Sequence, residues 1–265
     1  MKISSHLSSI FPTAVALSIA LPASAAPRSA SFDVTHELKV ALPKDAKNIR
    51  IWFAMPQKDP LQKLQNFRIA APFSHKVVKD SAGNETIFIE LKNPKRREFT
   101  VTETFNITRM EQVSGVDAKK AKSLSARDRN KLAPDLSANT HILVNDDTRK
   151  LAAEIVGKEK NSVVASRKIY DWVLANIDYW VKDPKNKKAS PVGSSEYCLS
   201  SKTGNCTDFH SLYTSLSRSA GIPTRMVYGS FFKADLNQKD ADQSYHCWPE
   251  FYVKGIGWVP NDVAV

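Results

Sequence analysis

The stretch Gly204–His210, GNCTDFH, leads into a segment in which apolar side chains recur at three- and four-residue spacing. That spacing is typical of one face of an α-helix. The apolar residues concerned are Phe209, Leu212, Tyr213, Leu216 and Ala220. Gly221 and Pro223 come next, and both residue types favour a helix end. The sequence therefore predicts a helix that opens at the cysteine of this stretch and ends before Gly221.

Cys206 lies at the opening of this helix, where free backbone N–H groups and the helix dipole favour negative charge. A thiolate in such a place has a lowered pKa and is the reactive form of cysteine. Asn205 is a suitable N-cap, and Asp208 would accept a hydrogen bond in the first turn. The sequence therefore predicts a nucleophilic thiol, with a buried structural cysteine as the alternative.

The segments on either side of this helix indicate an α+β fold. Two helices precede it and three strands follow it, at residues 146–157, 162–177, 226–232, 245–253 and 258–262. Helices followed by an antiparallel run are typical of that class. We therefore expect an α-helical layer that packs on an antiparallel sheet.

His246 and Asp262 lie on the last two of these strands. An imidazole beside a thiol can accept its proton, and a carboxylate can orient the imidazole. A three-residue hairpin loop at 253–255 would place His246 directly opposite Asp262, whereas a two-residue loop would pair Asp262 with Cys247. We expect the three-residue loop, which brings Cys206, His246 and Asp262 together as a catalytic triad.

Several neighbouring residues allow two interpretations. Trp248 shares the face of His246 and would be a wall of the site or a donor to the transition state. Asp208 would be a helix-start acid or a substrate-binding group, and Asn205 is a second candidate to contact substrate. His210, one helical turn after the thiol, would be a packed residue, a second base or a metal ligand. Pro249 cannot donate to a ladder, so it should face outward or mark a bulge.

Cys198 and Cys247 form either a disulfide or two free thiols. On a strand the side chain of Cys247 should point away from that of His246, behind the site. A bridge would tie the loop before the helix to the histidine strand. A zinc site would need Cys198, Cys206, His210, His246 and Cys247, but their spacing matches no common closed site. We therefore expect neither a metal nor another cofactor.

The N-terminal part of the chain predicts other units. Residues 1–25 have a basic start, an apolar run and a small-x-small sequence, which indicate a secretory signal peptide. Short alternating runs predict a β-sandwich over residues 30–110. Residues 111–145 are polar and predict a connector with one short helix. The remaining segment, 146–265, carries the predicted site.

The chain has 265 residues, with 38 Lys and Arg against 27 Asp and Glu, so its formal net charge is +11. Hydrophobic residues are 42% and charged residues 25%, which excludes a disordered or collagen-like chain. Basic residues gather in Lys95–Arg97, Lys119–Lys131 and Lys182–Lys188. These runs are either solvated loops or a surface for an anionic polymer. No nucleic-acid motif and no membrane-spanning segment is evident in the sequence.

Four ordered blocks of this sequence resemble the core of the transglutaminase-like superfamily, in particular its exported bacterial branch. The blocks are Gly204–His210, Gly221–Arg225, His246–Tyr252 and Gly257–Asp262. The resemblance covers roughly residues 145–265 and implies a papain-like α+β core preceded by a β-sandwich. Members usually have a small residue or Val in place of Pro249 and continue beyond the aspartate, so the core is expected to be short at its C-terminal end.

The resemblance implies that Cys206 is the nucleophile, His246 the general base and acid, and Asp262 the orienting carboxylate. The backbone N–H of Cys206 would contribute to an oxyanion hole. We therefore expect an exported, periplasmic or extracellular, thiol enzyme that attacks amide bonds in a protein, peptide or wall peptide, with hydrolysis favoured over cross-linking. The alternative is a catalytically silent binding module that keeps the fold as a scaffold.

Overall fold

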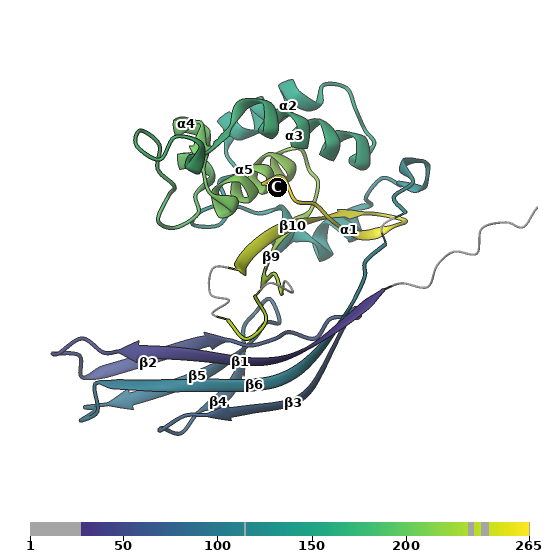
Figure 1. Cartoon of the computed structure of the whole chain (residues 1–265). Coiled ribbons are helices and arrows are strands. Elements are labelled where there is room, and N and C mark those ends of the chain that lie inside the picture. Colours follow the sequence, from purple (N-terminus) through teal and green to yellow (C-terminus); the bar gives the residue numbers. More distant parts are fainter. Residues whose placement is uncertain (1–27, 114, 233–235, 240–243, 265) are drawn as a thin grey trace, which may run out of the picture. The chain divides into compact units, whose positions relative to one another are not determined.

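The structure is a computed structural model that describes residues 28–113, 115–232, 236–239 and 244–264. It divides into two compact units, Met1–Val113 and Ser114–Val265 (Figure 1). The predicted signal peptide, residues 1–25, lies outside the described residues. Among the helices that the structure describes, none combines the length and apolar character needed to cross a membrane.

The first unit is a β-sandwich of two three-stranded antiparallel sheets, with strand orders β1-β6-β3 and β2-β5-β4. The strands are β1 (Ser29–Ala41), β2 (Asn48–Ala54), β3 (Gln62–Ala70), β4 (Lys76–Lys79), β5 (Glu85–Lys92) and β6 (Glu98–Met110). Ile87 and Ile89 of β5 and Val101 of β6 are fully buried in one apolar cluster. The two sheets therefore pack face to face, as the alternating pattern predicted.

Two strands of the sandwich, β3 and β4, have no clear period-two signal in the sequence. In β3 the pairing with β6 shifts register between Gln65 and Arg68, and Asn66 has φ of 54°. A bulge of this kind places one extra residue on the strand, so apolar side chains no longer alternate. The bulge explains why the sequence pattern did not reveal β3.

The second unit places five helices around and beside an antiparallel sheet of order β11-β10-β9 (Figure 1). The helices are α1 (Ala126–Lys131), α2 (Asp146–Val156), α3 (Ser162–Asn176), α4 (Ser195–Ser201) and α5 (Cys206–Ser219). The strands are β7 (Asp178–Tyr179), β8 (Thr203–Gly204), β9 (Thr224–Ser230), β10 (Tyr245–Val253) and β11 (Gly257–Pro260), and short 3₁₀ helices span Ala118–Lys120, Ala133–Leu136 and Trp180–Lys182. The segment predicted as a connector packs within this unit, where Arg218 of α5 donates to Ser137 O at 2.6 Å.

Helix α5 is buried on all sides from Asp208 to Arg218, although its sequence predicted only one apolar face. Small polar side chains on the other faces are buried because they bond to backbone oxygens. Ser211 donates to Gly193 O at 3.0 Å, and Ser215 donates to Leu143 O at 2.5 Å. The predicted helix end is confirmed, since Gly221 adopts φ of 78° directly after the helix.

The hairpin between β10 and β11 differs from the predicted register. Val253 pairs with Gly257, so the loop is 254–256 and not 253–255. The pairing of β10 with β11 ends at Glu250 and Pro260, so His246 has no partner on β11 and does not lie opposite Asp262. Gly255 and Gly257 adopt positive φ, at 96° and 110°. A hairpin loop of this length needs a residue with positive φ, and either glycine can supply it, so two registers are compatible with the sequence. The sequence alone therefore does not distinguish the two loops.

Pro249 explains where the pairing of β11 ends. Asn261 N–H donates to Pro249 O at 2.9 Å, but Pro249 has no N–H to return the second bond of that pair. β11 ends at Pro260, and the chain leaves the sheet after Asn261. Asp262 is therefore a residue beyond the strand, and it reaches His246 without being its cross-strand neighbour.

Gly204 allows β8 to lie against α5. A Cβ on Gly204 would lie 2.3 Å from the Cβ of Asp208, a distance that real Cβ atoms do not tolerate. Gly204 also pairs with Tyr179 in the short parallel ladder of β7 and β8. Because Gly204 has no side chain, β8 can pack closely against the start of α5 while its pairing with β7 positions Tyr179.

We expect Gly204→Ala to lower the free energy of unfolding by about 1–3 kcal/mol, because the added methyl group overpacks a buried contact. Urea unfolding followed by circular dichroism measures the change. Gly115→Ala is the matched control, since no heavy atom lies within 4 Å of a Cβ built there. Equal effects of the two substitutions would contradict this account of Gly204.

Candidate functional site

The N-terminus of α5 is held by a buried carboxylate. Asp208 is fully buried, and its oxygens accept from the backbone N–H groups of Ser190 at 3.0 Å, Ser194 at 2.9 Å and Asn205 at 3.0 Å. The Asn205 side chain in turn accepts from Asp208 N–H, which completes a capping box. Both residues were candidates to contact substrate, but the oxygens of Asp208 are occupied, so it fixes the helix start.

Cys206 is the first residue of α5 and is partly exposed. Its pKa is lowered to about 5, mainly by a hydrogen bond from the Cys247 thiol and also by His246, against the opposing effect of burial. The pKa of Cys247 is raised, because a thiol that donates to a neighbouring thiolate holds its own proton more tightly. Of the two sulfurs, Cys206 is therefore the one that ionises.

The predicted partners of this thiol come together around Asp262. His246 Nε2 lies 2.6 Å from Asp262 Oδ2, which leaves Nδ1 of His246 for the sulfur of Cys206. The two imidazoles of His210 and His246 hold the pKa of Asp262 at about 2, although burial opposes this effect. Asp262 is therefore an ionised acceptor at neutral pH.

His210 provides the second imidazole at this carboxylate. The residue is fully buried on α5, and its Nε2 lies 3.1 Å from Asp262 Oδ1. Its Nδ1 lies 3.3 Å from Cys247 Sγ. The rings of His210 and His246 meet edge to face, with centroids 5.7 Å apart. Its spacing from Cys206 made it a candidate, but its link to Asp262 has no sequence signal.

Of the two alternatives for Cys198 and Cys247, the structure has the free thiols, and Cys206 is free as well. Cys198 packs in the apolar core of the second unit, where burial raises the pKa of its thiol. Cys247 does not point behind the site as predicted. Its Sγ lies 3.6 Å from Thr207 Oγ1, so it faces the start of α5.

Aromatic side chains flank the imidazole of His246. Phe231 stacks on it with ring centroids 4.6 Å apart, and Trp248 lies 6.5 Å away on the same face of the sheet. The ring of Trp248 covers Gly229, where a Cβ would lie 3.1 Å from it. Trp248 therefore lies beside His246 on the same face of the sheet, a position compatible with both of its predicted roles.

Tyr179 is a further residue at the site that the sequence did not reveal. Its hydroxyl oxygen accepts from the backbone N–H of Cys206 at 3.3 Å. Its ring packs near Phe209 of α5, with centroids 5.7 Å apart. Only the pairing of β7 with β8 brings Tyr179 here, and two-residue strands have no detectable periodicity.

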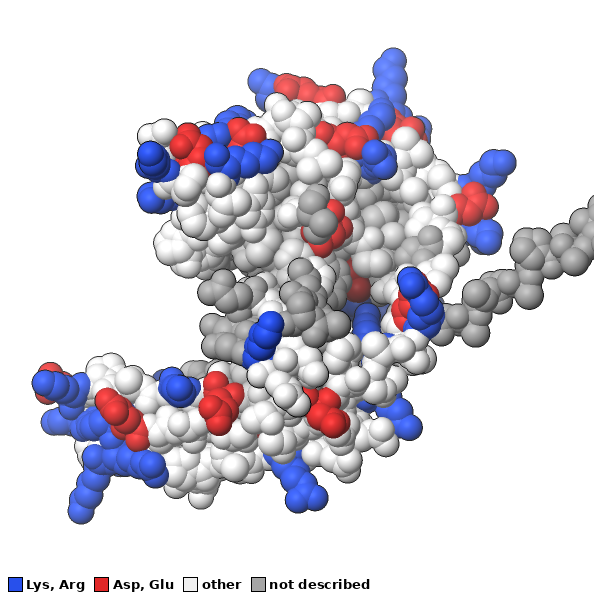
Figure 2. All heavy atoms as spheres, in the orientation of Figure 1, with Lys and Arg blue, Asp and Glu red and all other residues white. Residues whose placement is uncertain are grey.

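The sequence also raised a zinc site and a surface for an anionic polymer. Among the described residues, no group of three or more His, Cys, Asp or Glu side chains is arranged to hold a metal ion. Figure 2 shows Lys and Arg interspersed with Asp and Glu on the face drawn. In the basic run Lys182–Lys188, for example, Lys187 bonds Asp178 at 2.6 Å. The sequence proposal of an anionic polymer thus gains no support from the surface.

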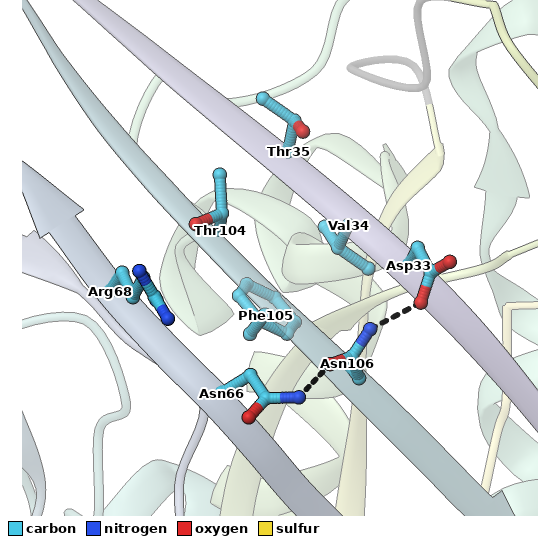
Figure 3. Close-up of a pocket in the computed structure, with 8 residues that line it drawn as sticks. All are labelled: Asp33, Val34, Thr35, Asn66, Arg68, Thr104, Phe105 and Asn106. Atoms are coloured by element: carbon cyan, nitrogen blue, oxygen red, sulfur yellow. Dashed lines mark hydrogen bonds between the residues drawn. The ribbon is translucent and has the colours of Figure 1, made fainter.

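A separate hollow of about 280 Å³ lies on β1, β3 and β6 of the sandwich (Figure 3). Its polar side chains bond one another: Asn66 donates to Asn106 at 2.6 Å, and Asn106 donates to Asp33. These groups contain no thiol or imidazole. The hollow therefore has none of the residue types that carry the chemistry proposed around Cys206, apart from the carboxylate of Asp33.

Residues 149–263 match the profile of the transglutaminase-like superfamily. A protein of Haemophilus influenzae that carries no functional name is 24% identical over 256 residues, which are 88% of this chain and 68% of that protein. A candidate cysteine protease from Cytophaga hutchinsonii has a similar structure, with a TM-score of 0.65 and 19% identity over 90% of this chain and 79% of its own. The periplasmic domain of TgpA from Pseudomonas aeruginosa has a TM-score of 0.47 and 16% identity, over 89% and 72% of the two chains.

We expect iodoacetamide to alkylate Cys206 with a pH midpoint near 5, because its pKa is lowered to about 5 and the thiolate is the reactive form. Thiolate chemistry should thus be nearly complete at about pH 7, where an ordinary thiol is only a few per cent ionised. Mass spectrometry of tryptic peptides reports each cysteine separately.

The raised pKa values of Cys198 and Cys247 predict little labelling of either residue in the folded protein. The urea-unfolded protein is the internal control, in which all three thiols should react alike. A midpoint for Cys206 near that of an ordinary thiol would contradict the description of the site.

Proposed function

Because residues 149–263 form a transglutaminase-like domain, we propose that it is a thiol acyl-transfer enzyme that attacks amide bonds through Cys206, His246 and Asp262. The observation that supports this most directly is the ordered contact of the three groups. Asp262 bonds Nε2 of His246 at 2.6 Å, and His246 in turn lowers the pKa of Cys206. A thiolate, an imidazole and an orienting carboxylate in this order can transfer an acyl group.

In the proposed reaction the Cys206 thiolate attacks the carbonyl carbon of an amide. The C–N bond then breaks as His246 gives its Nδ1 proton to the leaving nitrogen, and a thioester remains on Cys206. His246 next takes a proton from the acyl acceptor, which attacks the thioester and restores the thiolate. Asp262 keeps Nε2 of His246 protonated throughout, so that Nδ1 exchanges the proton.

We propose that Tyr179 helps to stabilise the tetrahedral intermediate. The backbone N–H of Cys206 is the donor closest to the developing oxyanion, and the Tyr179 hydroxyl lies 3.3 Å from that nitrogen. An oxyanion that approaches the N–H would also meet the hydroxyl, whose proton it can accept. Burial and the nearby thiolate raise the pKa of Tyr179, so the hydroxyl keeps its proton at neutral pH. Donors aimed at developing charge are among the largest contributions to acyl transfer.

Water is the proposed acyl acceptor, which makes the enzyme an amidase or peptidase. Hydrolysis needs no second binding site, whereas transfer to a primary amine would need one for the amine. The proposed substrates are proteins, peptides or wall peptides. Export is also proposed, on the basis of the signal-like sequence in residues 1–25.

We expect Cys206→Ala to abolish release of amine from a peptide library that the wild-type protein cleaves, because Cys206 supplies the sulfur of the proposed thioester. The wild-type protein should form a covalent acyl adduct on Cys206, detected by mass spectrometry after acid quenching. Cys198→Ala, in the apolar core away from the chemistry, controls for general effects of losing a thiol.

Running the same library with and without a primary amine separates hydrolysis from transamidation. Amine-dependent products would replace the hydrolytic proposal by transglutaminase activity. Absence of both turnover and adduct, with Cys206 still labelled selectively, would favour the alternative of a silent binding module.

We expect Tyr179→Phe to lower kcat by about 10- to 100-fold with little change in KM, because the hydroxyl would bond mainly to the oxyanion. The ring packing against Phe209 is kept, so stability should change little. The rate of Cys206 alkylation by iodoacetamide is the control, since that reaction passes through no oxyanion. An unchanged kcat would exclude Tyr179 from this role.

A further inference from the structure

The second histidine, His210, makes contacts that a simple triad does not need. It is fully buried, and it connects the carboxylate of Asp262 to the thiol of Cys247 through its two ring nitrogens. Both partners in turn contact the proposed reacting groups, Asp262 through His246 and Cys247 through Cys206. In a neutral imidazole one ring nitrogen donates a hydrogen bond and the other accepts one. When both nitrogens of a buried imidazole have hydrogen-bond partners, the tautomer therefore determines which partner is the donor.

The contacts of Asp262 indicate where this proton lies. Asp262 is ionised at neutral pH and can only accept, and Nε2 of His210 lies 3.1 Å from its Oδ1. Two acceptors would repel at this distance in a buried site, so Nε2 carries the proton. The backbone N–H of Val263 also points at Nε2, at 3.2 Å, and it competes for the same atom. The bond to the carboxylate is charge-assisted and therefore the stronger of the two.

This assignment makes Nδ1 of neutral His210 an acceptor. Cys247 Sγ, 3.3 Å away, is then the donor. Its single proton is shared between Nδ1 of His210 and the Cys206 thiolate, so it stays on Cys247. The alternative, in which Cys247 ionises, would place two negative sulfurs together at the start of one helix. Repulsion between such like charges disfavours it.

We propose that His210 is a positioning residue that holds Asp262 in line with His246 through Nε2 and keeps Cys247 protonated through Nδ1, so that Cys206 alone is the thiolate. This inference rests on the proposed function, in that it takes Cys206 as the nucleophile. The titratable groups that face this cluster are His246, Cys247 and Tyr245 from β10, Asp262 after β11, Tyr179 from β7, Tyr228 from β9, and Cys206 and His210 from α5.

Two substitutions of His210 separate its two contacts. The amide of His210→Gln reaches about as far as Nε2 and can still donate to Asp262, but it offers no acceptor at the place of Nδ1. The amide of His210→Asn reaches about as far as Nδ1 and can still accept from Cys247, but it no longer reaches Asp262. The readout is the pH profile of iodoacetamide alkylation at each cysteine, with thermal unfolding measured in parallel.

For His210→Asn we expect the alkylation midpoint of Cys206 to rise by about 1–2 pH units, because Asp262 no longer fixes the imidazole that supports the thiolate. Labelling should stay selective for Cys206. For His210→Gln we expect a midpoint closer to that of the wild-type protein, with Cys247 now labelled as well. Identical profiles for both variants, whether like the wild-type profile or equally shifted, would overturn the proposal.

A measurement on the unaltered protein covers the case in which both variants fail to fold. Long-range ¹H–¹⁵N correlation spectra of histidine-labelled protein report the tautomer of each imidazole. We expect the Nε2–H tautomer of His210, because Nε2 faces the carboxylate of Asp262 and Nδ1 faces the thiol of Cys247. An Nδ1–H tautomer or a doubly protonated ring would overturn the proposal.

Neither readout needs a substrate. A failure to find amide turnover would therefore count against the proposed function alone. A wrong tautomer or unselective profiles would count against the role of His210 alone.

Discussion

The carboxylate of Asp262, shared between two imidazoles, is the interaction on which the proposed chemistry depends. Its two oxygens bond His246 and His210, so one group joins the sheet to the central helix. A half-buried carboxylate is stable as an anion only when donors replace the water it has lost. Here two ring nitrogens and the Ala264 N–H supply them. The arrangement therefore stabilises the charge and fixes the angle at which His246 meets the sulfur.

A second carboxylate, that of Asp208, fixes the start of α5 beside Cys206. Asp208 collects three backbone N–H groups from the loop before α4 and from the start of α5. Hydrogen bonds to a charged acceptor contribute about 1.5–3 kcal/mol each, so this loop and this helix end are firmly joined. The position of Cys206 is thus set by main-chain contacts, and its reactivity is tuned by side chains from the sheet.

Much of this arrangement could be predicted from the sequence, because helix ends and central strands have strong local signals. The helix from Cys206 with its Asn205 cap and the strand Tyr245–Val253 have the predicted limits. What could not be predicted depends on contacts far apart in the chain. The hairpin register depended on a turn in which both Gly255 and Gly257 adopt positive φ, and β3 was hidden by its bulge.

The same limit applies to the site. Local patterns singled out Cys206, His246 and Asp262, because each lies on a strong element or in a distinctive block of sequence. Tyr179 comes from a two-residue strand, and the roles of His210 and Cys247 appear only once the helix and sheet are packed. Cys247 was assigned to the wrong side because the sequence does not show which face of the strand packs against α5.

The chain leaves the sheet after Asn261, opposite Pro249, and this has a consequence for the stability of the site. Asp262 belongs to no ladder, and the buried side chain of Val263 is the apolar contact of its segment with the core, beside the hydrogen bonds to the two histidines. Burying one valine contributes about 1.5–3 kcal/mol, well below the stability of a typical whole domain. The segment Asn261–Ala264 can therefore detach as a local opening while the sheet and α5 stay folded. Heat or mild denaturant should then disconnect the carboxylate before the domain unfolds, so catalytic competence and global folding would be lost at different temperatures.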